Sequence, residues 1–358
     1  GCLIAVFLVF ILTNIIGKTS QSTGLPFPVI LRLSMGLNGA RYIGMLRALV
    51  GIFMFGIQTF FISKSLGYLF RILLYQIDNQ ILTNEYLLIF FFGLNPLDWF
   101  SLFITLLFQL YLFTKGPETN RIFLKFSAFF IYFGLIVFFI IIISENYNEL
   151  INSLLISTNL ENAISKKNIL PLFYITGTTF AYFSILIVSY GDFSRYAKNN
   201  KEMQLGNFTL IFNLIIFSFF AILLTLGSDI ILTKNSISIE RLLTNPNDII
   251  AKFNNSFLTV FSLVFILISM ISTNLIANYI PSQNALINFL PNSLSLRKAS
   301  YVVIFLGLVV GGFWLSIFSQ PSIILIFDNL SAFFGPIFGI IIADYYYVKK
   351  QKINHKEL

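Results

Sequence analysis

Three clusters of polar side chains interrupt long apolar stretches of this sequence, and their residue types decide which chemistry the chain could perform. The first is the run Phe55-Gly56-Ile57-Gln58-Thr59. The carboxamide of Gln58 both donates and accepts hydrogen bonds, so it could recognise an amide edge on a ligand. A polar side chain in an apolar helix could equally bind a neighbouring helix, and both interpretations stay open.

The second cluster holds five polar residues within ten consecutive positions. Ser269, Ser272 and Thr273 lie about one helical turn apart, so they can share a face. Hydroxyl oxygens together with free backbone carbonyls form a cage of hard oxygen ligands that suits Na⁺. Asn274 and Asn278 are spaced i, i+4 and line one face as well. Small hydroxyl residues also serve as packing devices between apolar helices.

The third cluster is Thr176-Gly177-Thr178-Thr179, followed by Phe183. Glycine and β-branched residues lower helix propensity, so this run predicts a broken helix. The ring of Phe183 offers a flat face on which a planar ligand could stack, although it could also be an ordinary packing residue.

The residue types that are scarce exclude other chemistry. The chain has one cysteine, Cys2, and one histidine, His355. An internal disulfide, metal sites built from His and Cys, and His-based catalytic triads are therefore excluded. No apolar segment carries a nucleophile beside a base, which argues against an intramembrane enzyme.

The elements that must position these clusters are apolar helices. Of the 358 residues, 57% are hydrophobic and 11% are charged, whereas soluble proteins are about 25% charged. A membrane-spanning helix needs roughly 20 mostly apolar residues. Nine stretches qualify: 1–16, 42–76, 86–114, 122–144, 169–190, 207–232, 256–280, 300–319 and 322–348. The sequence therefore predicts an all-α integral membrane protein with about nine spans, of which the second is too long for one straight crossing.

The charged residues indicate the topology. The net charge is +8, and nine spans place 16 of the 23 Lys and Arg residues on one side. The positive-inside rule makes that side cytoplasmic, so we expect a multi-pass protein of the cell membrane with a cytoplasmic C-terminus. The membrane topology accounts for the excess of positive charge, so we expect no nucleic-acid partner. Asp192, Arg195 and Asp344 fall at cytoplasmic ends of spans, where we expect a topological or gating role, and Arg47 near the start of a span is interpreted in the same way.

Six motifs occur in a fixed order along the chain. They are Gly24-Leu25-Pro26-Phe27-Pro28-Val29 with Arg32, Arg47-Ala48 leading to Phe55-Gly56-Ile57-Gln58-Thr59, Lys115-Gly116-Pro117-Glu118-Thr119-Asn120-Arg121, Asp192-Phe193-Ser194-Arg195-Tyr196-Ala197-Lys198, Ser272-Thr273-Asn274 with Asn278, and Gly335-Pro336-Ile337-Phe338-Gly339 with Ala343-Asp344-Tyr345-Tyr346. Together they resemble the nucleobase:cation symporter-1 family of permeases, which carry uracil, cytosine, allantoin, hydantoin or thiamine-like rings.

The resemblance implies a fold of two inverted five-helix repeats, with substrate and ion near the membrane midplane. On that pattern, residues 1–145 hold the family's second to fifth spans and residues 146–168 form an extracellular or periplasmic loop. Residues 169–348 hold the sixth to tenth spans, and residues 349–358 form a basic cytoplasmic tail. The family's first span and last two spans have no counterpart in the sequence, so a fragment is expected.

The resemblance also implies roles in substrate binding. Gln58 and Asn278 would hydrogen-bond the amide groups of the ring, and Phe183 would stack on it at a position that is commonly Trp. Met54 stands where hydantoin-type members have Trp, and this departure weighs against hydantoin-like specificity.

For the coupling ion, the resemblance implies that the hydroxyls of Ser272 and Thr273 and the backbone carbonyl of Ser269 bind Na⁺. H⁺ coupling stays open, although no span carries a central Asp or Glu. The expected function is symport of a small heterocycle such as uracil, allantoin or cytosine by alternating access, without a cofactor. The alternative is a transport-inactive sensor or a degenerate fragment of such a permease; a channel would need a filter ring that the sequence lacks.

Overall fold

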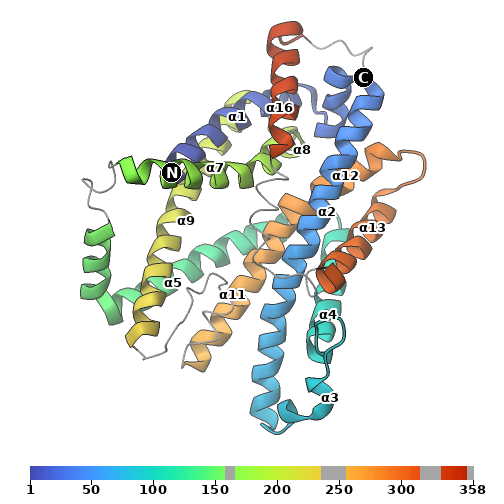
Figure 1. The fold of residues 1–358 in the computed structure, drawn as a ribbon. Coiled ribbons are helices and arrows are strands. Elements are labelled where there is room, and N and C mark those ends of the chain that lie inside the picture. The colour runs from blue at the N-terminus through green and yellow to red at the C-terminus, as the bar shows by residue number, and fades with distance from the viewer. Residues whose placement is uncertain (158–165, 235–254, 315–331, 353–358) are drawn as a thin grey trace.

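The computed structural model describes residues 1–157, 166–234, 255–314 and 332–352, and they fold into helices joined by short connections (Figure 1). Apart from an isolated bridge between Phe91 and Leu94, these residues contain no β-structure. Eight of the described helices are long and apolar enough to cross a membrane. The predicted all-α class is confirmed.

The elements follow one another along the chain in a simple order. The helices are α1 (Cys2–Thr23), α2 (Phe27–Ile77), α3 (Glu85–Leu88), α4 (Pro96–Thr114), α5 (Pro117–Ser157), α7 (Lys166–Val188), α8 (Gly191–Ser194), α9 (Asn200–Lys234), α11 (Ser256–Asn274), α12 (Ile280–Phe289), α13 (Leu296–Leu308) and α16 (Phe334–Ile342). A 3₁₀ turn, η1 (Ile81–Thr83), and three π-helical segments, η2 (Leu275–Tyr279), η3 (Val309–Trp314) and η5 (Ala343–Val348), complete them. The predicted span 322–348 begins outside the described residues, and its described part is a shorter apolar helix, Phe334–Val348.

The second predicted span, 42–76, follows a kink at Gly36 and a short helical segment that the sequence did not predict. α2 is 51 residues long and begins at Phe27, and Gly36 interrupts it with φ 68° and ψ 177°. Glycine tolerates this conformation because it has no Cβ. A Cβ on Gly36 would meet no atom within 4 Å, so the backbone angle alone favours glycine there. The stretch before the kink, residues 27–35, is called the lead segment below.

Two other predicted interruptions are helical. α5 continues to Ser157, so the described part of the predicted loop 146–168 is mostly helix; no Gly or Pro lies between Gly134 and Pro171 to stop it. α7 runs unbroken through Gly177 to Val188, so the predicted helix break is wrong. A break within lipid would leave backbone groups unpaired, which costs more than the roughly 1 kcal/mol lost at one glycine.

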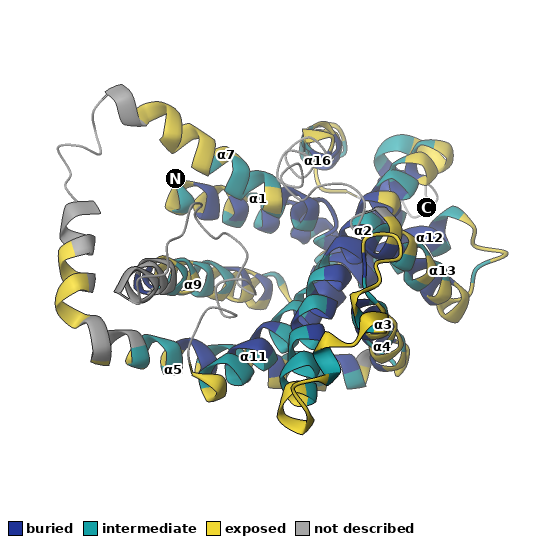
Figure 2. Cartoon of the chain, turned by 60° about the horizontal axis from the view of Figure 1, so that its bottom comes forward, coloured by how far each residue is buried: buried dark blue, intermediate teal, exposed yellow. Residues whose placement is uncertain are grey.

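The described helices pack as two bodies (Figure 1). In the first helix body, α1 packs against α7, α8 and α9. In the second helix body, α2 packs against α4, α11, α12 and α13. α5 touches α9 and α11, and α16 touches α7 and α2, so these two helices contact both bodies. Buried residues are concentrated along α2, the centre of the second body (Figure 2).

α2 crosses the α13–η3 helix at glycines. A Cβ on Gly56 would lie 2.6 Å from Val310 Cβ, and one on Gly307 would lie 2.5 Å from the ring of Phe55. Small residues let helix backbones approach closely in membranes, where dispersion contacts drive association. This crossing fixes the stretch of α2 that carries Gln58.

Candidate functional site

Gln58 on α2 and Asn278 in η2 form a hydrogen-bonded amide pair. Asn278 Nδ2 donates to Gln58 Oε1 at 2.9 Å, although the two residues are 220 positions apart. Gln58 Nε2 donates to the backbone carbonyl of Met270 at 3.2 Å. The structure therefore brings together the two residues that the sequence analysis assigned to ring recognition.

A chain of hydrogen bonds continues behind the amide pair. Asn278 Nδ2 also donates to Asn274 Oδ1 at 2.9 Å, and Asn274 Nδ2 donates to Thr59 Oγ1 at 3.2 Å. Thr59 Oγ1 donates to Gln109 Oε1 on α4 at 3.1 Å. Asn274, Thr59 and Gln109 are each 0% exposed. Sequence reasoning missed Gln109, although a lone carboxamide in the apolar run of α4 was the signal that could have found it.

The helix that carries Asn278 is locally widened. η2, Leu275–Tyr279, is π-helical and lies between α11 and α12. Single π-helical turns inserted into α-helices occur frequently at functional sites, because they re-aim side chains without ending the helix. Apolar periodicity gave no indication of this turn, since the segment is apolar on most faces.

The three predicted Na⁺ ligands lie together on α11. Ser272 Oγ donates to the Ser269 carbonyl at 2.8 Å, and Thr273 Oγ1 donates to the same carbonyl at 2.9 Å. Three oxygens therefore converge within one turn, and this hard donor set fits an alkali cation. Hydroxyls also bond to preceding carbonyls in ordinary helices, so the contact alone does not distinguish an ion site from packing. Among the described residues, no group of three His, Cys, Asp or Glu side chains gathers as a metal site.

The two predicted ring-flanking residues lie in different bodies. Met54 is 3% exposed and belongs to the main apolar core on α2, one turn before Gln58. Phe183 lies on α7, packs against the apolar cluster that includes Val9, and meets Tyr182 edge to face at 5.3 Å. Stacking of Phe183 on a ring held by Gln58 stays a prediction.

Arg47 lies 11 residues after the kink at Gly36 and is 0% exposed, so it is buried among the helices. Its guanidinium donates to Ser189 Oγ at 3.3 Å and to the Ala277 carbonyl at 2.8 Å. A buried charge needs such partners, and these lie in both helix bodies. Arg47 therefore joins the end of α7 to η2.

Asp192, in α8, is buried beside the lead segment. It is 1% exposed, and its Oδ1 accepts from the backbone N–H of Phe27 at 3.2 Å. Burial raises its pKa from 3.8 to about 6, opposed by the positive charges of Arg195 and Arg47 and by the Phe27 N–H. Arg195 donates to Tyr196 OH at 2.6 Å.

Asp344, in η5, contacts the other end of the lead segment. Its Oδ2 accepts from Ser34 Oγ at 3.0 Å and lies 3.4 Å from Lys349 Nζ. Lys349 also donates to the carbonyl of Leu33. Asp192 and Asp344 thus both hold the lead segment, one from the first body and one from the end of α16.

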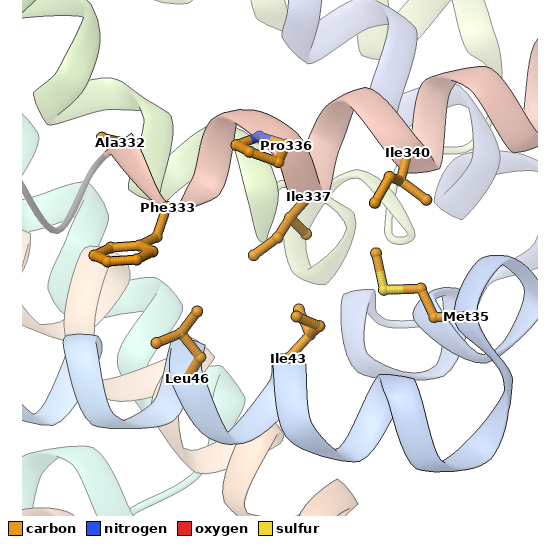
Figure 3. Close-up of a pocket in the computed structure, with 8 residues that line it drawn as sticks. All are labelled: Met35, Ile43, Leu46, Ala332, Phe333, Pro336, Ile337 and Ile340. Carbon is orange, nitrogen blue, oxygen red and sulfur yellow. The ribbon is translucent and has the colours of Figure 1, made fainter.

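A separate pocket of about 820 Å³ lies between α2 and α16 (Figure 3). Its lining is Met35, Ile43, Leu46, Ala332, Phe333, Pro336, Ile337 and Ile340. All of these side chains are apolar, and none is a predicted site residue. A ring with N–H and C=O groups would leave them unpaired there, which costs about 1–3 kcal/mol per group, so the amide pair is the better candidate site.

Comparison with known proteins identifies the family of the chain. The family of permeases for cytosine/purines, uracil, thiamine and allantoin matches residues 2–358. The chain belongs to this permease family. It is therefore a multi-pass membrane protein, in agreement with the eight helices among its described residues that are long and apolar enough to cross a membrane.

Similar permeases come from plants and bacteria. The purine-uracil permease of Arabidopsis thaliana is 27% identical over 342 residues, which are 94% of this chain and 53% of that permease. The allantoin permease of Bacillus subtilis is 26% identical over 347 residues, 96% of this chain and 67% of that protein. The chain thus spans about half the length of the plant permease and about two thirds of the bacterial one.

Solved structures confirm the fold. Mhp1, a nucleobase-cation-symport-1 family transporter in a closed conformation with bromovinylhydantoin bound, matches with a TM-score of 0.70 and 18% identity, covering 99% of this chain and 72% of Mhp1. The inward-facing conformation of Mhp1 matches with a TM-score of 0.65. The permease fold predicted from the motifs is therefore present.

Proposed function

We propose that this permease-family chain is a secondary active transporter that carries a small heterocycle with amide groups, such as uracil, allantoin or cytosine, together with Na⁺. The observation that carries the proposal is the Gln58–Asn278 pair, which places two carboxamides side by side within the second helix body. A neutral, largely buried pair suits an uncharged polar ring, because buried amides reject ligands that leave them unpaired. The relatives' names, purine-uracil and allantoin permease, support this substrate class.

The ion is assigned to the oxygens of Ser269, Ser272 and Thr273, which follow each other on the helix that leads to Asn278. Ion binding at that turn would order the segment that holds the ring, which gives a physical basis for coupling. H⁺ is the alternative coupling ion. We further assign residues 1–145 and 169–348 to the two inverted repeats, and the C-terminus to the cytoplasmic side of the cell membrane.

Transport would follow from relative motion of the two bodies. The amide pair lies on the second body and Phe183 on the first, so a ring between them would be enclosed when the bodies approach. Alternating access in such folds is largely rigid-body rocking of one bundle against another. Asp192, Arg195 and Asp344, which lie where the lead segment meets the first body and α16, are assigned to gating.

The test is ligand-dependent thermal stability of the purified protein in detergent. Uracil, cytosine, allantoin, hydantoin and thiamine would each be added with Na⁺ and with an inert cation. We expect one ring class to raise the melting temperature, and more so with Na⁺, since binding to the folded state stabilises it. The effect should vanish in Gln58→Ala and Asn278→Ala and lose its Na⁺ dependence in Thr273→Ala.

Matched controls separate the site from general destabilisation. Gln204→Ala removes an exposed carboxamide, and Thr114→Ala removes an exposed hydroxyl that, like Thr273, bonds to the carbonyl four residues earlier. Both controls should keep the ring effect. A folded protein that no ring stabilises with either cation would contradict the proposal, and pH dependence in place of Na⁺ dependence would identify H⁺ as the ion.

A further inference from the structure

The orientation of the two carboxamides in the amide pair is decided by backbone carbonyls. Nitrogen and oxygen of an amide are often hard to assign, but a backbone carbonyl can only accept. Gln58 faces the Met270 carbonyl at 3.2 Å, so that side must be its NH₂. Asn274 faces the Phe55 carbonyl at 3.3 Å, so its NH₂ points there. The remaining oxygens, Gln58 Oε1 and Asn274 Oδ1, both point at Asn278.

This arrangement fixes Asn278 as well. Its NH₂ has two hydrogens, and both are used, one on Gln58 Oε1 and one on Asn274 Oδ1, each at 2.9 Å. No described residue donates to Asn278 Oδ1, and Gln58 keeps one N–H beyond its bond to Met270. The pair therefore offers a ligand one acceptor, on Asn278, and one donor, on Gln58.

The residues behind the pair hold this direction in place. Asn274 Nδ2 also donates to Thr59 Oγ1 at 3.2 Å, and the Thr59 hydroxyl in turn donates a hydrogen bond to Gln109 Oε1 at 3.1 Å. All three side chains are 0% exposed, so water does not compete for these bonds. In a low-dielectric interior, turning the Asn274 amide would set its oxygen against the Phe55 carbonyl and its NH₂ against the NH₂ of Asn278.

We propose that Asn274, Thr59 and Gln109 are positioning residues that fix the direction of hydrogen bonding at the amide pair, so that the site selects rings with N–H next to C=O. This inference rests on the proposed function and adds the edge chemistry of the substrate and the residues that enforce it. A lactam or ureide edge donates to Asn278 Oδ1 and accepts from Gln58 Nε2. A ring that carries acceptors alone leaves Asn278 Oδ1 without a donor.

The experiment measures dissociation constants for uracil and hydantoin, which carry the N–H and C=O edge, and for pyrimidine, which offers ring nitrogens as acceptors alone. Asn274→Leu removes one of the two acceptors that hold the Asn278 NH₂ and leaves the other, Gln58 Oε1, so the Asn278 amide turns toward the ring more readily. We expect uracil or hydantoin to bind about tenfold more weakly, pyrimidine to bind at least as well as to the parent protein, and the preference between them to fall at least tenfold.

Thr59→Val is a second variant with a smaller expected effect. It removes the hydroxyl that accepts from Asn274 and should reduce the preference for uracil or hydantoin over pyrimidine about threefold. Thr59→Ser keeps the hydroxyl and should restore that preference. The matched control is Asn207→Leu, which removes a 1% exposed asparagine from a similar network with Asn14 in the first helix body. It should lower the melting temperature and leave the preference unchanged.

An unchanged preference in both Asn274→Leu and Thr59→Val overturns this inference and leaves the proposed function intact if Gln58→Ala still abolishes binding. An equal loss of preference in Asn207→Leu also overturns it, because the effect would then be general. If no ring binds to the parent protein, the proposed function fails and the inference fails with it.

Discussion

Two buried polar regions of this chain differ in their charge and in the elements that they join. The network from Gln58 to Gln109 is uncharged, lies within the second helix body, and is joined by direct hydrogen bonds from one amide or hydroxyl to the next. The region around Arg47 and Asp192 is charged, and its contacts link the first body to α2 and η2. In these two regions, neutral groups organise the interior of one body and charged groups connect the two bodies.

The difference has a physical reason. A buried amide can be satisfied by partners that move with it, so a network within one body keeps its geometry when the bodies shift. A buried charge costs several kcal/mol unless it is paired, so charges that link two bodies make their relative position energetically distinct. The proposed ring site and the proposed gate need these opposite properties.

A third polar region sharpens the contrast. Asp98 on α4 is paired directly with Arg71 at 2.8 Å and Lys64 at 3.3 Å, all within the second helix body. Asp192 has positive charges nearby, but burial dominates and its pKa is raised to about 6. Burial thus raises the pKa of the carboxylate that lies between the bodies.

The largest effect is expected from placing a charge in the neutral network. Gln58→Glu keeps the shape and the acceptor for Asn278, but it sets an oxygen against the Met270 carbonyl, which can only accept. We expect ring affinity to fall by about 100-fold or more at pH 8 and to recover partly near pH 5, as the carboxyl is protonated. Titration calorimetry at both pH values measures this, and parent-like affinity at pH 8 would contradict the neutral-site account.

The next largest effect is expected on the pH dependence of stability, through Asp192 in the charged region. The raised pKa of Asp192 means that the folded state binds its proton more tightly than the unfolded state does. The free energy of unfolding therefore falls as pH rises from about 4 to about 6, by on the order of 3 kcal/mol. Asp192→Asn should remove that fall and be at least as stable as the parent protein above pH 7.

Melting temperatures between pH 4 and pH 8 measure the difference, with Asp98→Asn as the control. Asp98→Asn removes a directly paired carboxylate and should lower stability at pH 8. If Asp192→Asn and the parent protein show parallel pH profiles, Asp192 is not the titrating group and the contrast between the two carboxylates fails.

The smallest effect is expected at the kink that places the lead segment against Asp192 and Asp344. Gly36→Ala should cost about 1–3 kcal/mol, because φ 68° with ψ 177° is a conformation that alanine rarely adopts. Gly177→Ala is the matched control: this glycine is helical with open space around it, so alanine should stabilise by up to about 1 kcal/mol. Equal melting temperatures for the two variants would show that the kink does not depend on glycine.

The sequence predicted the spans because 20-residue apolar stretches leave few alternatives to membrane helices. It did not predict the lead segment, residues 27–35, which is helical and meets the span at the non-helical backbone of Gly36. The break predicted at Gly177 is absent because lipid penalises unpaired backbone groups more than glycine weakens a helix.

For the candidate site, residue type drew attention to Gln58 and Asn278, because carboxamides are unusual in apolar spans. Sequence spacing could not show that Asn278 bonds to Gln58 or that Thr59 reaches Gln109, since these contacts join separate helices. The π-helical turn at η2 was also hidden, because hydropathy carries no signal for one extra residue in a turn.

The most direct test of the central claim is substrate counterflow in proteoliposomes. Vesicles containing the purified protein would be loaded with the ring that raises its melting temperature most and diluted into trace labelled ring, with or without Na⁺. The account predicts transient accumulation of label that depends on Na⁺ and is abolished in Gln58→Ala but not in Gln204→Ala. Ring binding without any counterflow would contradict transport by this chain and would favour a sensor that keeps the same amide pair.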